Sequence, residues 1–94
     1  MRARLTDDQI DTRLAQCPQW TREGDAIVRT VECLDFAAAI AFVVHVGFLA
    51  EAKDHHPDID IRWRTVRLLL TTHDLGGLSE WDFELAGEID AVAP

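Results

Sequence analysis

Apolar and polar residues alternate along this chain with two periods, one close to two residues and the other between three and four. The shorter period is typical of strands and the longer one of helices. Read in order, the segments predict helix, strand, strand, helix, strand, strand, helix, at residues 6–17, 20–23, 26–33, 36–53, 58–63, 65–72 and 79–89. This order predicts a single α+β domain over residues 1–94, with an antiparallel four-stranded sheet that carries the helices on one face.

The predicted helices begin at residues that are suited to cap them. Thr6 and Asp35 carry oxygen-bearing side chains that accept hydrogen bonds from the free N–H groups of a first helical turn. The segment Ser79-Glu80-Trp81-Asp82 resembles a capping box, in which the hydroxyl and the carboxylate each bind the other residue's backbone N–H. Pro18 ends the first helix, because proline cannot continue the backbone hydrogen bonding.

The long central helix is predicted to bury one apolar face. The positions of this face, spaced by four, three and four residues, are Phe36, Ile40, Val43 and Gly47. Four residues further on, the same face reaches Glu51, close to the negative end of the helix dipole. The pattern leaves two interpretations open: the stripe ends at the surface there, or the carboxylate belongs to a site.

The predicted strands at residues 58–63 and 65–72 have no obvious turn between them. Their apolar residues on one side are Ile59, Ile61 and Trp63 in the first strand and Val66, Leu68 and Leu70 in the second. Because no Gly or Asn marks a tight turn, one long bent strand is an alternative to two paired strands.

Composition and charge limit the possible functions. Seventeen acidic residues outnumber nine basic ones, and the net charge of −8 opposes binding to nucleic acid or to anionic membranes. Cys17 and Cys33 are isolated and fit reduced, structural thiols of a cytosolic protein. The first residues lack the apolar core of a secretory signal, and the uncharged segment 36–50 is shorter than the ~20 residues of a membrane span. We therefore expect a cytoplasmic protein.

Histidine is the most informative residue type chemically, since imidazole exchanges protons near neutral pH. Three of the four histidines, His55, His56 and His73, fall in the short region between residues 51 and 73. Folding the last strand back against the long helix would bring His73 toward His55 and Glu51. Pro57 favours an extended backbone before it, so the side chains of His55 and His56 are expected to point in opposite directions and to do different jobs. A shared metal ion is therefore not expected, and no HExxH motif is present.

Two other polar residues have simpler explanations. His45 lies between two valines in the middle of the long helix, which favours packing or a contact between subunits. Asp82 is expected to cap the last helix rather than to act as a catalytic acid.

A gapped combination of these residues resembles a known family. The pattern Glu51-x3-His55-His56-Pro57-x5-Trp63-x9-His73, followed by Gly77-Leu78-Ser79-x2-Asp82, is similar to the signature of the pterin-4a-carbinolamine dehydratases. The resemblance extends from about Trp20 to Asp90. It implies dehydration of 4a-hydroxytetrahydropterin to quinonoid dihydropterin and water, in support of tetrahydrobiopterin recycling. The pterin would be the substrate, and neither a cofactor nor a metal is implied.

The resemblance also implies roles for individual residues. The two substrate-lining segments would be Asp54-His55-His56 and Thr71-Thr72-His73. The catalytic candidates are His55, His56 and His73, of which His55 and His73 would form the acid/base pair and His56 would mainly bind substrate. The remaining candidates, with a binding, structural or site role, are Glu51, Trp63 and Asp82.

Four positions depart from the family's pattern, and they are Val31, Cys33, His45 and Phe48. They leave the site motif intact and bear on assembly. Family members form dimers or dimers of dimers, so the resemblance implies a homodimer or homotetramer. An alternative function is a non-catalytic scaffold, coactivator or assembly chaperone on the same fold. The retention of all three histidines favours the enzyme.

Overall fold

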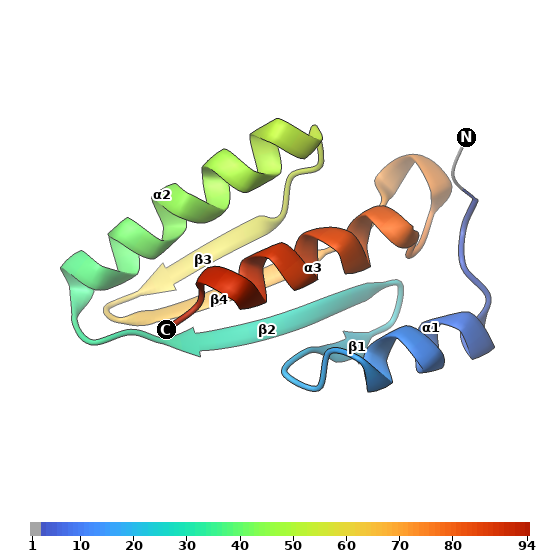
Figure 1. Ribbon diagram of the computed structural model, residues 1–94, viewed down its shortest axis with the longest axis horizontal. Coiled ribbons are helices and arrows are strands. Elements are labelled where there is room, and N and C mark those ends of the chain that lie inside the picture. The colour runs from blue at the N-terminus through green and yellow to red at the C-terminus, as the bar shows by residue number, and fades with distance from the viewer. Residues whose placement is uncertain (1–2) are drawn as a thin grey trace.

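The computed structural model describes residues 3–94, which fold into helices and an antiparallel sheet in the predicted order (Figure 1). The elements are α1 (Asp7–Ala15), β1 (Thr21–Glu23), β2 (Ala26–Glu32), α2 (Phe36–Lys53), β3 (Asp58–Arg62), β4 (Thr65–Leu70), the 3₁₀ helix η1 (His73–Leu75) and α3 (Glu80–Val92). Residues 1–2 of the predicted domain lie outside the described residues. The predicted α+β class is confirmed.

The strands pair antiparallel in the order β1-β2-β4-β3. β3 and β4 form a hairpin in which Ile59 is paired with Leu68 and Ile61 with Val66. The alternative of one long bent strand is therefore wrong. The turn has no Gly or Asn signal because its left-handed residue is Trp63, with a φ of 53°.

One face of the sheet carries the core. The buried residues of β2 and β4 on this face are Ile27, Val31, Val66, Leu68 and Leu70. They form one cluster with side chains from each α-helix, including Ile10 of α1, Val46 of α2 and Leu85 of α3. The intervening strand positions point to the opposite face and include polar residues, such as Thr30 and Arg67, as well as the apolar Val28 and Leu69. The helices therefore cover one face of the sheet, as predicted.

The buried side of α2 differs from the predicted one. Its buried residues are Ala39, Phe42, Val46 and Ala50. Phe36 and Ile40 are 52% and 40% exposed, Gly47 is also exposed, and Val43 alone of the predicted face is partly buried. The predicted face is wrong because almost every residue from 36 to 50 is apolar, so the periodicity does not distinguish one side of the helix from another.

The 18 residues of α2 are long and apolar enough to cross a membrane by length and composition alone, a property that the core helix of a globular domain can share. In this fold, one side of α2 packs against α3 and β4 instead. The other side leaves apolar side chains exposed, among them Val44 and Phe48. An apolar helix of this length therefore has one side in the core and one side without a partner in the monomer.

The predicted helix caps are present. The Thr6 hydroxyl accepts a hydrogen bond from the Gln9 N–H, and the Gln9 side chain accepts one from the Thr6 N–H. Asp35 accepts a hydrogen bond from the backbone of α2 at 2.8 Å. Ser79 and Asp82 form the reciprocal capping box at the start of α3. Each cap satisfies N–H groups that have no partner within the helix.

Both cysteines are buried, and their thiols are free. Burial raises the pKa of Cys17, and the carboxylate of Asp90 adds to this effect. Burial also raises the pKa of Cys33, with further contributions from Glu32 and Asp35. A raised pKa leaves less reactive thiolate at neutral pH, which agrees with a structural role for both thiols.

Asp90 of α3 connects the last helix to the start of the sheet. Its Oδ1 accepts a hydrogen bond from the Trp20 indole N–H at 2.8 Å and another from the Arg29 guanidinium. The Arg29 side chain is only 12% exposed, so its charge is largely removed from water. A guanidinium in this position requires a carboxylate partner to offset the loss of hydration.

We expect Asp90→Ala to lower the free energy of unfolding by about 2 kcal/mol, because it leaves the Arg29 guanidinium and the Trp20 indole N–H without their acceptor. Urea unfolding followed by circular dichroism measures this change. Asp11→Ala, which replaces an exposed acid of α1, is the matched control and should change the stability by less than about 0.5 kcal/mol. Equal stability of the two variants would contradict this role for Asp90.

Candidate functional site

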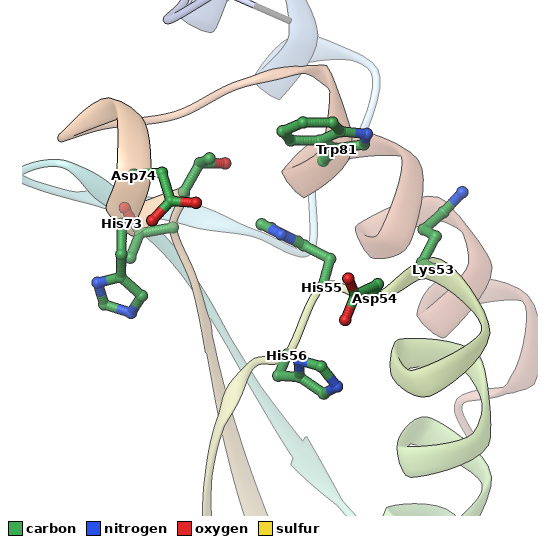
Figure 2. Close-up of a pocket in the computed structure, with 9 residues that line it drawn as sticks. Lys53, Asp54, His55, His56, His73, Asp74 and Trp81 are labelled. Atoms are coloured by element: carbon green, nitrogen blue, oxygen red, sulfur yellow. The ribbon is translucent and has the colours of Figure 1, made fainter. Parts of the chain in front are cut away.

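The end of α2, the end of β4 and the first turn of α3 meet around a pocket of about 420 Å³ (Figure 2). The residues that line it are Lys53, Asp54, His55, His56, Thr71, Thr72, His73, Asp74 and Trp81. Both segments expected to line a substrate site therefore border one pocket. The fold brings His73 to the same pocket as the adjacent residues His55 and His56.

The chain leaves α2 through a sharp turn at Asp54. Asp54 adopts the left-handed conformation, with a φ of 51°, and its N–H binds the carbonyls of Ala50 and Glu51. Aspartate tolerates this conformation better than most residues do. As a result, the imidazoles of His55 and His56 leave the chain in different directions (Figure 2). Each contacts a different acid, which confirms that they have separate surroundings.

His55 is bound to a fully buried carboxylate. Its Nε2 lies 2.5 Å from Asp82 Oδ1, and Asp82 is 0% exposed. The second oxygen, Oδ2, accepts hydrogen bonds from the Thr72 hydroxyl at 2.8 Å and from the Ser79 N–H at 2.9 Å. The two hydroxyls of Thr72 and Ser79 are also hydrogen-bonded to each other at 2.7 Å. Every group of this buried network has a partner, as burial of a charge requires.

The Asp82 contact determines which nitrogen of His55 remains for a ligand. An ionised carboxylate only accepts hydrogen bonds, so with Asp82 ionised this contact requires the proton on Nε2 of His55. Nδ1 is then the ring nitrogen that can accept or donate a proton elsewhere. Asp82 thus caps α3, as expected, and also orients His55, which the capping pattern did not indicate.

His56 and Glu51 form a second, exposed pair. Their Nε2 and Oε1 atoms are 2.8 Å apart, and the side chains are 57% and 80% exposed. Glu51 is not among the residues that line the pocket. Glu51 therefore lies at the surface, like most of the stripe that it continues. An exposed pair of this kind contributes little to stability.

The segment after β4 carries the third histidine. The hydroxyl of Thr71 donates to the Asp25 carbonyl at 2.6 Å, whereas Thr72 is buried with its hydroxyl in the Asp82 network. The Thr72 N–H binds the Gly77 carbonyl at 3.0 Å, which closes the loop that contains η1. His73 begins η1 and is exposed, on a different side of the pocket from His55 (Figure 2).

Trp63 does not line this pocket. It lies in the β3–β4 turn, at the opposite end of the hairpin from the histidines, and is 69% exposed. The Arg64 guanidinium lies 4.8 Å from the centre of its ring. This contact is a cation–π interaction at the surface. A site role for Trp63 within the monomer finds no support in its position.

Three lining residues were not predicted: Lys53, Asp74 and Trp81. Each is the sequence neighbour of a predicted residue, so extending each candidate segment by one position would have found them. The Lys53 amine lies 2.8 Å from Glu88 and 3.6 Å from Glu84. The hydrogen bond to Glu88 raises the pKa of Lys53, so this side chain is a fixed cation rather than a base at neutral pH.

The pocket is equipped for proton transfer. Imidazoles, carboxylates and hydroxyls converge there, and one imidazole has a buried carboxylate behind it. Among residues 3–94, no group of three or more His, Cys, Asp or Glu side chains is arranged to hold a metal ion. General acid–base chemistry is what this arrangement supports directly.

Comparisons with known proteins match nearly the whole chain. The family model described as "Pterin 4 alpha carbinolamine dehydratase" matches residues 3–92. The "Putative pterin-4-alpha-carbinolamine dehydratase" of Roseiflexus sp. (strain RS-1) is 56% identical over 92 residues, which cover 98% of this chain and 99% of the relative. The protein of the same name from Chloroflexus aurantiacus (strain ATCC 29366 / DSM 635 / J-10-fl) is 60% identical over 89 residues, which cover 95% and 96%.

A solved structure has the same fold. The crystal structure of the transcriptional coactivator/pterin dehydratase from Brucella melitensis superposes with a TM-score of 0.93 at 30% sequence identity. The superposition covers 97% of this chain and 99% of the other. The likeness therefore includes the segments that form the pocket.

We expect Nε2 of His55 to be protonated at neutral pH, because its partner is a buried carboxylate. Long-range ¹H–¹⁵N spectra of the labelled protein report which ring nitrogen carries the proton. Asp82→Asn should release this preference, since an amide can accept from Nε2 or donate to it. Glu51→Gln, the same exchange at an exposed site, should leave the His55 signals unchanged. Unprotonated Nε2 in the wild-type protein would contradict the assignment.

Proposed function

Because this chain belongs to the pterin-4-alpha-carbinolamine dehydratase family, we propose that it converts a 4a-hydroxytetrahydropterin to the quinonoid dihydropterin and water. The observation that carries the proposal is the convergence of His55, His56 and His73 on one pocket, with Asp82 behind His55. This step would support recycling of a tetrahydrobiopterin-type cofactor, and we propose the cytoplasm as its location.

The reaction requires two proton transfers. The bond between C4a and the hydroxyl oxygen breaks, its electron pair leaves with the oxygen, and a proton must be supplied to release water. A ring nitrogen loses a proton, and its electrons form the new double bond to C4a. No electrons are exchanged with another molecule, so the proposal needs no redox cofactor and no metal. Positioned acid and base groups typically accelerate such steps by ~10²–10⁴-fold.

We assign the base to His55 and the acid to His73. Nε2 of His55 is held by Asp82, which leaves Nδ1 for the substrate, and the carboxylate would stabilise the positive charge that forms when Nδ1 takes a proton. His73 is exposed, so it can exchange protons with water between turnovers. His56 would bind the polar edge of the pterin rather than transfer a proton.

A non-catalytic scaffold on the same fold is the alternative. A scaffold has no requirement for three imidazoles around one pocket. The arrangement of His55, His56 and His73 therefore favours catalysis over the scaffold.

We expect the protein to accelerate dehydration of 4a-hydroxytetrahydropterin, and His55→Ala and His73→Ala each to lower kcat by about 10²-fold or more, because each removes one proton-transfer group. Stopped-flow absorbance measures the rate. His45→Ala, which removes the exposed histidine of α2, is the matched control and should retain full activity. A folded wild-type protein that gives no acceleration would overturn the proposal in favour of the scaffold.

We also propose that the protein self-associates through the exposed side of α2. The apolar residues there are spaced by four residues, and they are Phe36, Ile40, Val44 and Phe48. A continuous apolar stripe on a helix is typical of an interface with a second helix. Of the positions that depart from the family's pattern, Phe48 and His45 are exposed residues of α2. Val31 and Cys33 are buried within the monomer. Only the first two are therefore placed to affect assembly through α2.

We expect Phe48→Glu to shift the protein toward a smaller assembly, because a carboxylate would have to be buried against an apolar partner. Sedimentation equilibrium of the wild-type protein and the variant measures the change in mass. Gln19→Glu places the same charge at an exposed position between α1 and β1 and should leave the mass unchanged. A wild-type protein that is monomeric at high concentration would refute self-association.

A further inference from the structure

Trp81 differs in chemistry from the other residues that line the pocket. The remaining lining residues of the described chain carry charges, hydroxyls or imidazoles. Such groups can bind the polar edges of a heterocycle, but its two faces require apolar or aromatic surface. Trp81 offers the largest aromatic surface among these lining residues, because an indole is larger than the imidazoles of His55, His56 and His73.

The position of Trp81 is fixed relative to the proposed base. It is the second residue of α3 and directly precedes Asp82, whose capping box holds the first turn of the helix. The Trp81 ring centre lies 6.2 Å from that of His55, with an angle of 37° between the ring planes. The side chain is partly exposed, so a ligand can reach part of the indole.

The geometry brings any ligand of the proposed acid/base pair close to this indole. Figure 2 shows Trp81 beyond His55, with His73 and Asp74 on another side of the pocket. A bicyclic molecule that contacts both His55 and His73 must extend across the pocket. Because Trp81 lines the same pocket, with its ring centre 6.2 Å from that of His55, the indole is placed to contact a heterocycle bound there. In the 4a-hydroxy compound C4a is tetrahedral, but the other five atoms of the pyrimidine ring are trigonal, so this half keeps a flat surface.

We propose that Trp81 is a specificity-determining residue that stacks against the pyrimidine half of the pterin. The inference rests on the proposed function, since it concerns the ligand of the same pocket. An indole exchanges no proton, so its contribution appears in substrate binding and not in the chemical step. It favours planar heterocycles over polar molecules of similar size.

The test compares Trp81→Leu, which removes the aromatic surface, with Trp81→Phe, which retains it. Trp63→Leu removes an exposed indole outside the pocket and is the matched control. Two quantities are measured: KM and kcat for 4a-hydroxytetrahydropterin, and the Kd for fully oxidised pterin, which is planar and cannot be dehydrated. Isothermal titration calorimetry gives the Kd, and circular dichroism establishes that each variant is folded. If Trp81→Leu does not fold, Trp81→Met gives the same comparison.

We expect Trp81→Leu to raise KM and Kd by about three- to tenfold, with kcat changed by less than about twofold. Trp81→Phe and Trp63→Leu should stay within about twofold of wild type in both constants. An active wild-type protein whose KM and Kd do not respond to Trp81→Leu would overturn the inference. A fall in kcat at constant KM would also overturn it, because Trp81 would then act by positioning His55.

Failure of the proposed function gives a different result. A folded wild-type protein that neither dehydrates the substrate nor binds oxidised pterin would remove the ligand on which stacking depends. In that case the proposed function and this inference both fall. If the wild-type protein is active and Trp81→Leu leaves KM and Kd unchanged, only the stacking is refuted.

Discussion

The buried carboxylate of Asp82 is the constraint on which the site depends. A charge removed from water is tolerated only if hydrogen bonds replace its hydration. The partners of Asp82 come from three separate segments: His55 follows α2, Thr72 follows β4, and Ser79 precedes α3. Satisfying one charge therefore fixes the relative positions of the three segments that form the pocket.

The two proposed proton-transfer groups are held in different ways. His55 has an 11% exposed side chain, and its imidazole is directed by the contact with Asp82. His73 is exposed, and its placement depends on the backbone of the loop closed between Thr72 and Gly77. One group is thus oriented by a side-chain hydrogen bond and the other by the path of the chain. A ligand meets a fixed imidazole on one side and a solvent-accessible one on the other.

The element order and the helix caps could be predicted from the sequence, because capping residues and apolar periodicity act locally. The approach of His73 to His55 and His56 followed from the element order and from the gapped motif. The buried side of α2 could not, since nearly all its residues are apolar and only the packing selects a side. The turn at Trp63 uses a residue that carries no turn signal. The capping pattern accounted for Asp82 by itself. Its contact with His55, 27 residues away in the sequence, exists only in the folded chain and could not be predicted from that pattern. Glu51 continued an apolar spacing but lies at the surface.

The double role of Asp82 affects how this fold can change over evolutionary time. Replacing Asp82 removes a helix cap and leaves buried hydroxyls without an acceptor, so it costs stability as well as activity. Replacing the exposed His73 costs little stability. We therefore expect a lineage released from selection for catalysis to lose His73 early and to keep the acid. In a related sequence, an aspartate at the position of Asp82 would say little about activity. A histidine at the position of His73 would distinguish enzymes from descendants that act only as non-catalytic scaffolds.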